Sequence, residues 1–303
     1  MASEVSGLTG KFFYDSVEQA VKKADIDMSF NMADSTSTAT NPLSTESIAL
    51  RATRTIKVDA LLYDAFGTEI VTGTLTLGKK YLVTASASTF DGKWAVGSLF
   101  TSDGTETATG TEKVKLHGDE ITGGSLALSI AGTFKCTAMD YSFKMNTADS
   151  TTTATDSSST EEIALRSVAT SKIDCIMYRD TADKVTNSTP TATALVLTFK
   201  TGTTITGTGV FKQMSITDDI NGIVKVSYQI DWVGLPVEVN CGFLEMGVSN
   251  SCQRIYETGT STNKEITGNA IFTEKTITAD VNSEVKISYS GTFVGAITPS
   301  VYS

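Results

Sequence analysis

Hydrophobic and polar residues alternate with a period of two along several stretches of this chain. Two of these stretches are related in sequence, "KVDALLYD" at residues 57–64 and "KIDCIMYRD" at residues 172–180. Their apolar positions fall on one face: Val58, Ala60 and Leu62 in the first, and Ile173, Cys175 and Met177 in the second. Alternation of this kind is typical of a half-buried strand. The pattern therefore predicts two strands, each with one face against a core.

Turn signals join other alternating stretches in pairs. Asn221-Gly222 lies between "SITDDI" and "IVKVSYQI", and this dipeptide favours a type I′ hairpin because both central residues need positive φ. Asn282-Ser283 and Gly123-Gly124 stand at the corresponding places of two further segments. We therefore expect three β-hairpins. The many Thr and Val residues, with only four prolines, also favour antiparallel strands.

Residues 16–24 have two interpretations. Ser16 and Gln19 have the spacing of a capping box, which predicts a short helix. The alternative is a hairpin that runs from "KFFYD" to "DIDMSF" through a wide turn. The pattern does not decide between the two.

The strongest signal is an internal repeat. Residues 33–59 match residues 148–174 at a constant offset of 115, with 17 identities in 27 positions and no gap. Just upstream, "DMSFNM" at residues 27–32 matches "DYSFKM" at residues 140–145 at an offset of 113, which predicts a short insertion between the two blocks. Self-similarity of this extent indicates that one structural unit has been duplicated.

A second repeat lies nearer the C-terminus. Residues 206–234 align with residues 267–295, with 13 identities in 29 positions. The tail of this unit returns as "LALSIAGTF" at residues 126–134, against "VKISYSGTF" at residues 285–293. The chain thus carries two opening segments and three closing segments.

The repeats predict an all-β protein with a tandem organisation. We expect two antiparallel β-sandwich or barrel-like domains, at residues 1–135 and 136–235, followed by a small C-terminal β-hairpin appendage at residues 236–303. The repeat is too long for a solenoid, whose units usually span about 20–50 residues.

The charge excludes one broad class of function. The formal net charge of −10 and the sequence pI near 4.7 argue against a nucleic-acid binder, because Lys and Arg hold phosphate backbones. The opening "MASEVSGLTGKFFYD" has no basic stretch followed by an apolar one, so no secretory signal is expected. No apolar run reaches the roughly 20 residues that cross a bilayer, so no membrane partner is expected. These features predict a protein made in the cytoplasm.

Residues with catalytic chemistry are scarce. His117 is the only histidine, and beside Gly118-Asp119 it is expected to be a surface turn residue rather than a base. The four cysteines lack metal-site spacing and are expected to be free, buried thiols. "DDIN" at residues 218–221 lacks the glutamate of a calcium loop and is expected to form a turn. We predict no enzymatic activity, no cofactor and no metal.

Three stretches resemble the major tail (tail tube) proteins of long-tailed bacteriophages. "GLTGKFFYDSVEQAVKKADIDMSFNMADSTSTAT" at residues 7–40 is similar to the opening of that family, in which a hairpin precedes a strand and a polar Asp/Thr segment. "IALRATRTIKVDALLYD" at residues 48–64 resembles the strand that follows. "GTGVFKQMSITDDINGIVKVSYQIDWVG" at residues 207–234 resembles the closing hairpin.

The resemblance implies a structural virion protein of the viral tail. Such a subunit forms stacked rings around a lumen through which the genome is ejected. The implied partners are other copies of the chain, tape-measure and tail-terminator type proteins, and viral DNA that passes without sequence recognition. An acidic wall would repel that DNA over roughly 10 Å, about one Debye length. The implied location is the virion, after assembly in the host cytoplasm.

The duplication bears on the number of chains in a ring. If the family's ring holds six tube domains, a chain with two of them would close as a trimer with pseudo-sixfold symmetry. A hexamer is the alternative.

The two polar repeats are expected to make subunit contacts. A linker has little reason to stay nearly identical in two copies while the neighbouring strand residues change. We therefore expect exposed loops at residues 33–47 and 148–162 that touch the neighbouring subunit or the next ring. The candidate contact residues are Asp34, Ser35, Thr36, Thr38, Thr40 and Glu46 in the first loop, and Asp149, Ser150, Thr151, Thr153, Thr155 and Glu161 in the second.

Two other functions fit the same composition. A phage capsid or tail decoration protein would also be acidic and Thr-rich, but it would bind an existing lattice. A carbohydrate-binding or adhesin β-sandwich module would need an exposed aromatic platform. The chain has only two tryptophans, Trp94 and Trp232, and the alternation around Trp232 predicts a core position for it.

Overall fold

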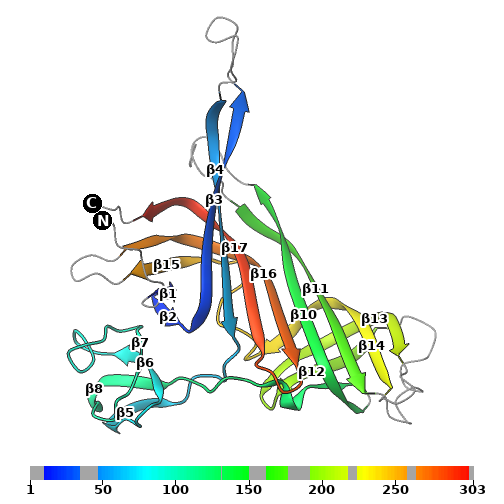
Figure 1. Ribbon diagram of the computed structural model, residues 1–303, viewed down its shortest axis with the longest axis horizontal. Coiled ribbons are helices and arrows are strands. Elements are labelled where there is room, and N and C mark those ends of the chain that lie inside the picture. The colour runs from blue at the N-terminus through cyan, green and yellow to red at the C-terminus, as the bar shows by residue number, and fades with distance from the viewer. Residues whose placement is uncertain are drawn as a thin grey trace, which may run out of the picture.

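The protein is built almost entirely from antiparallel β-strands. The computed structural model describes residues 10–34, 47–130, 132–149, 162–176, 192–217, 224–257 and 264–299. Their strands form one large sheet and one small four-stranded sheet (Figure 1). The all-β, antiparallel prediction is therefore confirmed. In the part of the chain that the structure describes, no helix is long and apolar enough to cross a membrane.

Among the described residues, one short 3₁₀ turn, η2 (Gly123–Ser125), lies between the strands. In chain order they are β1 (Lys11–Tyr14), β2 (Val17–Gln19), β3 (Val21–Asp34), β4 (Ser47–Leu61), β5 (Glu69–Thr74), β6 (Lys80–Ala85), β7 (Leu99–Thr101), β8 (Thr107–Leu116), β9 (Ala127–Ser129), β10 (Thr133–Asp149), β11 (Glu162–Ile176), β12 (Thr193–Lys200), β13 (Thr203–Thr217), β14 (Lys225–Val239), β15 (Ser249–Glu257), β16 (Lys264–Asp280) and β17 (Lys286–Pro299).

Residues 16–24 are strand, not helix. Asp15 and Ser16 have positive φ of 49° and 64°, so they form a tight turn that joins β1 to β2, with Tyr14 opposite Val17. Positive φ at both central residues matches the twist of a two-residue hairpin. The hairpin interpretation was right about strands, but the turn is tight rather than wide, and β3 follows as a separate strand.

A unit of four neighbouring strands occurs twice in the large sheet. In the first copy β3 pairs with β4, β4 with β17 and β17 with β16. In the second copy β10 pairs with β11, β11 with β14 and β14 with β13. The register is the same in both: Asp25 lies opposite Lys57 as Asp140 lies opposite Lys172. The sequence duplication is therefore a duplication of one three-dimensional unit.

The predicted short insertion between the repeat blocks is wrong. Met28 lies opposite Arg54, and Phe143 lies opposite Ala169, so β3 and β10 correspond at an offset of 115 along their whole length. The bulges after Val21 and Phe30 recur at the same offset. The motif matched at 113 is thus shifted two residues along the strand. A shift of two keeps every side chain on its face, which is why the sequence tolerates it.

The predicted C-terminal appendage is also corrected. β16 and β17 lie inside the large sheet, between β4 and β10 (Figure 1). The expected boundaries at 135/136 and 235/236 fall within the continuous strands β10 and β14. The first copy combines the early strands β3 and β4 with the late strands β16 and β17, whereas the strands of the second copy, β10 to β14, follow one another in the middle of the chain. Linear division of the sequence could not show that the first copy is completed by strands from both ends of the chain.

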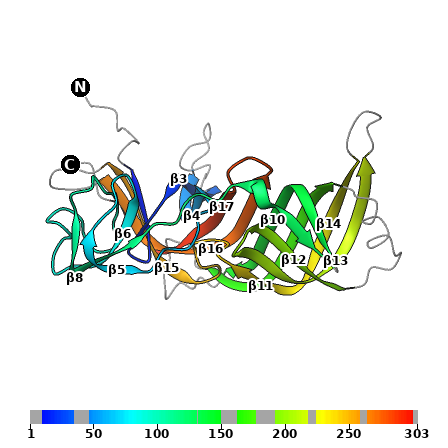
Figure 2. The ribbon, with the colours of Figure 1, turned by 90° about the horizontal axis from the view of Figure 1, so that it is seen from below.

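The third closing segment does not form the predicted hairpin. Gly123-Gly124 lies in the 3₁₀ turn, and β9 pairs instead with the start of β10 and with β12. These pairings close a cycle of six strands in the second copy, β10, β11, β14, β13, β12 and β9 (Figure 2). The short third match therefore marks a closing strand of the second copy rather than a third unit.

The core lies on one face of the duplicated strands. The predicted inward residues Val58, Ala60 and Leu62, together with Ile173 and Cys175, are buried in one large cluster, while Met177 lies outside the described residues. Trp232 is buried as predicted, and its Nε1 donates to Ser171 Oγ at 2.9 Å. All four cysteines are free and buried, which confirms that prediction.

Buried tyrosines make the fold sensitive to alkali. Burial raises the pKa of Tyr63 and Tyr228 to about 12, and it also raises that of Tyr141 and Tyr289. An unfolded tyrosine ionises near pH 10, so above that pH the unfolded chain loses protons that the folded chain keeps. The melting temperature is expected to fall as the pH rises above about 10, with little effect of these groups below it. Thermal melts combined with tyrosinate absorbance would check this, and ordinary titration in the folded protein would contradict it.

The small sheet, made of β5 to β8, has its own core and docks on the β1–β2 hairpin. Glu18 of the hairpin accepts a hydrogen bond from the Leu99 N–H at 2.9 Å, and its own N–H donates to the Gly97 carbonyl at 2.7 Å. Gly97 has a φ of +87°, and a Cβ there would lie 2.1 Å from the Ser16 carbonyl oxygen. Glycine is therefore required for this close approach.

Gly97→Ala is expected to lower the free energy of unfolding by more than about 2 kcal/mol, because left-handed backbone alone costs an L-residue roughly 1–2 kcal/mol. The clash with Ser16 adds to that cost. Gly78→Ala is the matched control, since its φ is +77° but no atom lies within 4 Å. Urea unfolding of the two variants should separate them. Equal losses would mean that the hairpin can move away from the small sheet freely.

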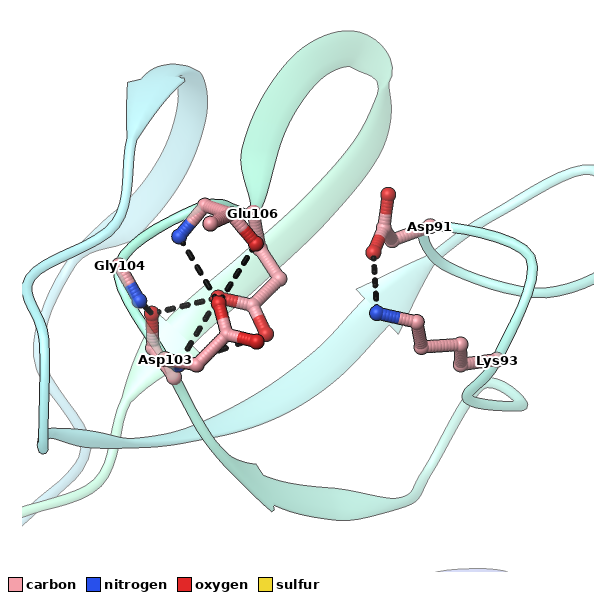
Figure 3. Close-up of polar contacts among 7 residues, drawn as sticks. Asp91, Lys93, Asp103, Gly104 and Glu106 are labelled. Atoms are coloured by element: carbon pink, nitrogen blue, oxygen red, sulfur yellow. Dashed lines mark hydrogen bonds and ion pairs between the residues drawn. The ribbon is translucent and has the colours of Figure 1, made fainter.

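A buried carboxylate organises the loop between β7 and β8. Glu106 accepts hydrogen bonds from Ser102 Oγ at 2.7 Å and from the Asp103 N–H at 3.1 Å (Figure 3). Asp103 accepts in turn from Thr105, and these bonds hold the pKa of the Asp103 carboxyl below its usual value. The acidic groups of this loop are thus satisfied by the loop itself.

Candidate assembly interface

The two copies of the four-stranded unit join edge to edge. β16 of the first copy pairs antiparallel with β10 of the second, from Ala138 opposite Asp280 to Lys144 opposite Glu274. The result is a continuous run of eight strands in the order β3, β4, β17, β16, β10, β11, β14, β13. We call the β10–β16 pairing the internal junction.

A buried ionic cluster spans the internal junction. Lys275 of β16 forms an ion pair with Glu238 of β14, and the Tyr141 hydroxyl of β10 donates to Glu238 at 2.7 Å. The Lys275 Nζ also lies 5.9 Å from the ring centroids of Tyr141 and Phe143. A buried charge is tolerated when a counter-charge and hydrogen bonds satisfy it. The cluster therefore ties the two copies together in one register.

The corresponding positions elsewhere in the chain are apolar. By the register, Tyr141 corresponds to Ile26 and Lys275 to Met214. Glu238 lies opposite Ile205 as Pro299 lies opposite Ile266, so Pro299 stands in its place. Ile26, Met214 and Pro299 thus stand where the other copy has the three members of the cluster, so these positions carry no charge that would need a partner.

Within the described ranges, both outer edges of the eight-stranded run include a stretch that no further strand covers. Among the described residues, β3 pairs only with β4, and residues 210–217 of β13 pair only with β14. Met28 and Phe30 on β3 are 46% and 54% exposed, and Met214 and Ile216 on β13 are 38% and 49% exposed. Their counterparts at the internal junction are mostly buried, including Phe143, Lys275 and Ile277. The edges thus expose the kind of surface that the internal junction covers.

The opposite face of the eight strands is polar. Lys144 and Glu274 form an ion pair of 2.5 Å on it, and Ser142 lies beside them opposite Thr276. Acidic and basic residues share this face: Asp25, Lys57, Asp59, Lys286, Asp140, Lys172 and Asp174. Ser and Thr fill many positions between them. The face is therefore hydrophilic with mixed charge.

The strand residues on either side of the predicted contact loops end two long pairs of strands, β3 with β4 and β10 with β11. Asp34 ends β3 opposite Ser47, and Asp149 ends β10 opposite Glu162, so the strands run further into the polar repeats than predicted. The other candidate residues lie outside the described residues: Ser35, Thr36, Thr38, Thr40, Glu46, Ser150, Thr151, Thr153, Thr155 and Glu161. Residues 218–223, with the predicted Asn221-Gly222 turn and the "DDIN" stretch, lie outside them too. The contact role of the loops stays a prediction.

His117 is more enclosed than a surface turn residue. Its ring makes edge contacts with Tyr63 and Phe66, with centroids 4.6 Å and 5.2 Å away. Burial lowers the pKa of this imidazole, which keeps it neutral near pH 7. The residue therefore packs as an aromatic group beside the small sheet.

Comparisons with known proteins give no match. No protein-family model matches the chain, and neither does any curated protein. Its function must therefore be inferred from its own geometry.

Proposed function

We propose that the protein is a self-assembling structural subunit of a viral tail tube, as the resemblance to tail tube proteins implies. One observation carries this proposal: the chain contains two copies of a sheet unit joined edge to edge, and in the part that the structure describes each end of the run has a stretch of unpaired edge. Exposed edges are a liability in a protein that stays alone, because they invite pairing with another chain. Here they suit a head-to-tail contact, which closes into a ring when the rotation allows it.

The proposed ring contains three chains. If the internal junction and the junctions between chains each turned one unit by a sixth of a circle relative to the next, the ring would have pseudo-sixfold symmetry. Six tube units then come from three duplicated chains. Two sandwich or barrel-like tube units in each chain are part of this proposal.

The proposed lumen wall is the polar face of the eight strands. Its charges include both signs, with the Lys144–Glu274 ion pair neutralising one pair of them. Among the described residues of this face, Lys57 lies opposite Asp25 and Lys172 lies opposite Asp140, so the phosphate backbone of DNA would meet both charges and slide without being held. The proposed lumen wall therefore carries charges of both signs and hydroxyl groups, whereas the net charge of the chain implied an acidic wall.

The remaining parts of the proposal follow from the tail location. Rings would stack, and tube ends would meet tape-measure and tail-terminator type proteins. The subunit would assemble in the host cytoplasm and remain in the virion. The fold supplies structure rather than catalysis in this proposal.

The disposition of the tryptophans disfavours a carbohydrate-binding module. Trp94 stacks on Phe100 at a centroid distance of 4.1 Å, and Lys93 Nζ lies 5.2 Å from its ring centroid. Trp232 is buried. Neither indole offers the open platform that a sugar ring needs.

Electron microscopy and mass measurement test the proposal. The purified chain is expected to form rings or tubes, and native mass measurement of a single ring should give three chains. Six chains per ring would contradict the trimer, while a persistent monomer that binds an existing viral lattice would favour a decoration protein.

A further inference from the structure

The two unpaired edge strands correspond, through the internal repeats, to the two strands that the chain already joins at the internal junction. The internal junction joins β10 to β16. The counterparts of these strands are β3 and β13, and among the described residues β3 and residues 210–217 of β13 have no neighbour on their outer side, at opposite ends of the eight-stranded run. We propose that β3 of one copy pairs antiparallel with β13 of a second copy, with Asp27 directly opposite Ser215. This inference rests on the proposed function and specifies the contact by which that function would be carried out.

The register follows from the two repeats. β3 and β10 correspond at an offset of 115, and β13 and β16 correspond at an offset of 61, in every pairing that both copies make. The internal pair Ser142 and Thr276 therefore becomes Asp27 and Ser215 between chains. The neighbouring pairs on the apolar face are Ile26 with Ile216 and Met28 with Met214.

The side chains that would meet are chemically matched. On the apolar face, Met28 and Met214 would cover each other, and both are now exposed to water. On the polar face, the Ser215 hydroxyl could donate to the Asp27 carboxylate. Removing apolar surface from water favours association, and flexible thioether side chains fill irregular gaps well.

The absence of an ionic cluster from the outer edges also favours pairing between β3 and β13. At the internal junction, Lys275 needs Glu238 and Tyr141 around it. Between chains, Met214 takes the place of Lys275, so no counter-charge is required. The charge pattern therefore distinguishes the two junctions: one is ionic and within a chain, the other is apolar and between chains.

One competing register is close at hand. The sequence match at an offset of 113 would slide β3 by two residues and place Ser29 opposite Ser215. Both registers keep the faces intact, so only a position-specific measurement separates them.

Engineered cysteine pairs make that measurement. The variant Asp27→Cys/Ser215→Cys is assembled under reducing conditions, checked for rings by electron microscopy, and then oxidised mildly with oxidised glutathione. We expect disulfide-linked multimers on a non-reducing gel, up to the number of chains in a ring. The variant Ser29→Cys/Ser215→Cys is expected to give roughly tenfold less product, because diagonal neighbours lie about 7–8 Å apart and a disulfide needs a much shorter Cβ separation.

Two controls accompany the pairs. Ser142→Cys/Thr276→Cys should form its disulfide within one chain and give no multimers, since these residues are opposite each other at the internal junction. If a double variant does not assemble, a mixture of Asp27→Cys chains and Ser215→Cys chains replaces it and should give linked dimers only. The wild-type cysteines are buried, and oxidation between Cys136 and Cys175 would leave the chain count unchanged.

Each outcome has one meaning. Multimers mainly from the Asp27 pair support the proposed register. Multimers mainly from the Ser29 pair overturn it in favour of the two-residue slide. Rings without any cross-link overturn the β3–β13 pairing but leave the proposed function standing, whereas a wild-type chain that forms no rings or tubes removes both.

Discussion

Replacing Met28 with glutamate is expected to give a folded monomer that no longer assembles. Met28 is half-exposed in the single chain, so its replacement removes little from the core. At the proposed junction the new carboxylate would face Met214 without a counter-charge. A buried unpaired charge costs about 3 kcal/mol or more, which weakens each contact by at least about two orders of magnitude. Sedimentation velocity and electron microscopy of Met28→Glu would measure the loss.

A matched control distinguishes the effect of position 28 from the effect of adding a negative charge to the surface. Leu77 is 70% exposed and lies in the turn between β5 and β6 of the small sheet, outside both edge strands. Leu77→Glu introduces the same charge and should assemble normally. The double variant Met28→Glu/Met214→Lys should recover part of the assembly, because opposite charges would then meet. Normal tubes from Met28→Glu alone would show that β3 does not lie between chains.

Removing the Glu238 side chain is expected to cost about 3–5 kcal/mol of unfolding free energy, because breaking a buried ion pair leaves an uncompensated charge. Glu238→Ala would leave Lys275 buried among Tyr141 and Phe143 without its counter-ion. The hydroxyl of Tyr141 would lose its acceptor as well. Urea unfolding monitored by fluorescence would give the difference, provided the transition has two states.

The control for Glu238 copies the chemistry of the other junction. Lys275→Met/Glu238→Leu replaces both charges by apolar groups, as Met214 and Pro299 do at the corresponding positions. This variant should be close to the wild type in stability or above it, because apolar replacement of a buried ion pair is often neutral or stabilising. If the double variant were as unstable as Glu238→Ala, packing rather than charge would be the cause.

The alternation of apolar and polar residues predicted the strands well. Val58, Ala60 and Ile173 alternate with charged neighbours, and each is buried on the face that the pattern assigned. Period-two patterns report on faces because neighbouring side chains point to opposite sides of a sheet. The duplication was visible for a different reason, because the polar segments at residues 33–40 and 148–155 are nearly identical.

The order of strands could not be read in the same way. Periodicity says which face of β16 is buried, but nothing in residues 264–280 says that its neighbours are β17 and β10. Long-range pairings depend on how the whole chain closes. The two-residue shift between "DMSFNM" and "DYSFKM" was invisible for a related reason, because both alignments place the same side chains inside.

The candidate interface was missed because edges are a property of strand order. Met28, Phe30 and Met214 have the pattern of core residues, and a sequence offers no sign that the neighbouring strand is absent. The polar repeats drew attention to the hairpin tips instead. The unpaired apolar edges became recognisable only when the two copies could be compared position by position.

Covalent fusion of the two copies also changes the concentration at which rings could form. Contacts inside one chain need no encounter between molecules, so the translational and rotational entropy of association is lost only where two chains meet. In a ring of three duplicated chains, three of the six junctions would be internal, one in each newly folded monomer. Nucleation would then require far fewer simultaneous encounters than a ring of single units, and assembly would begin at a lower protein concentration.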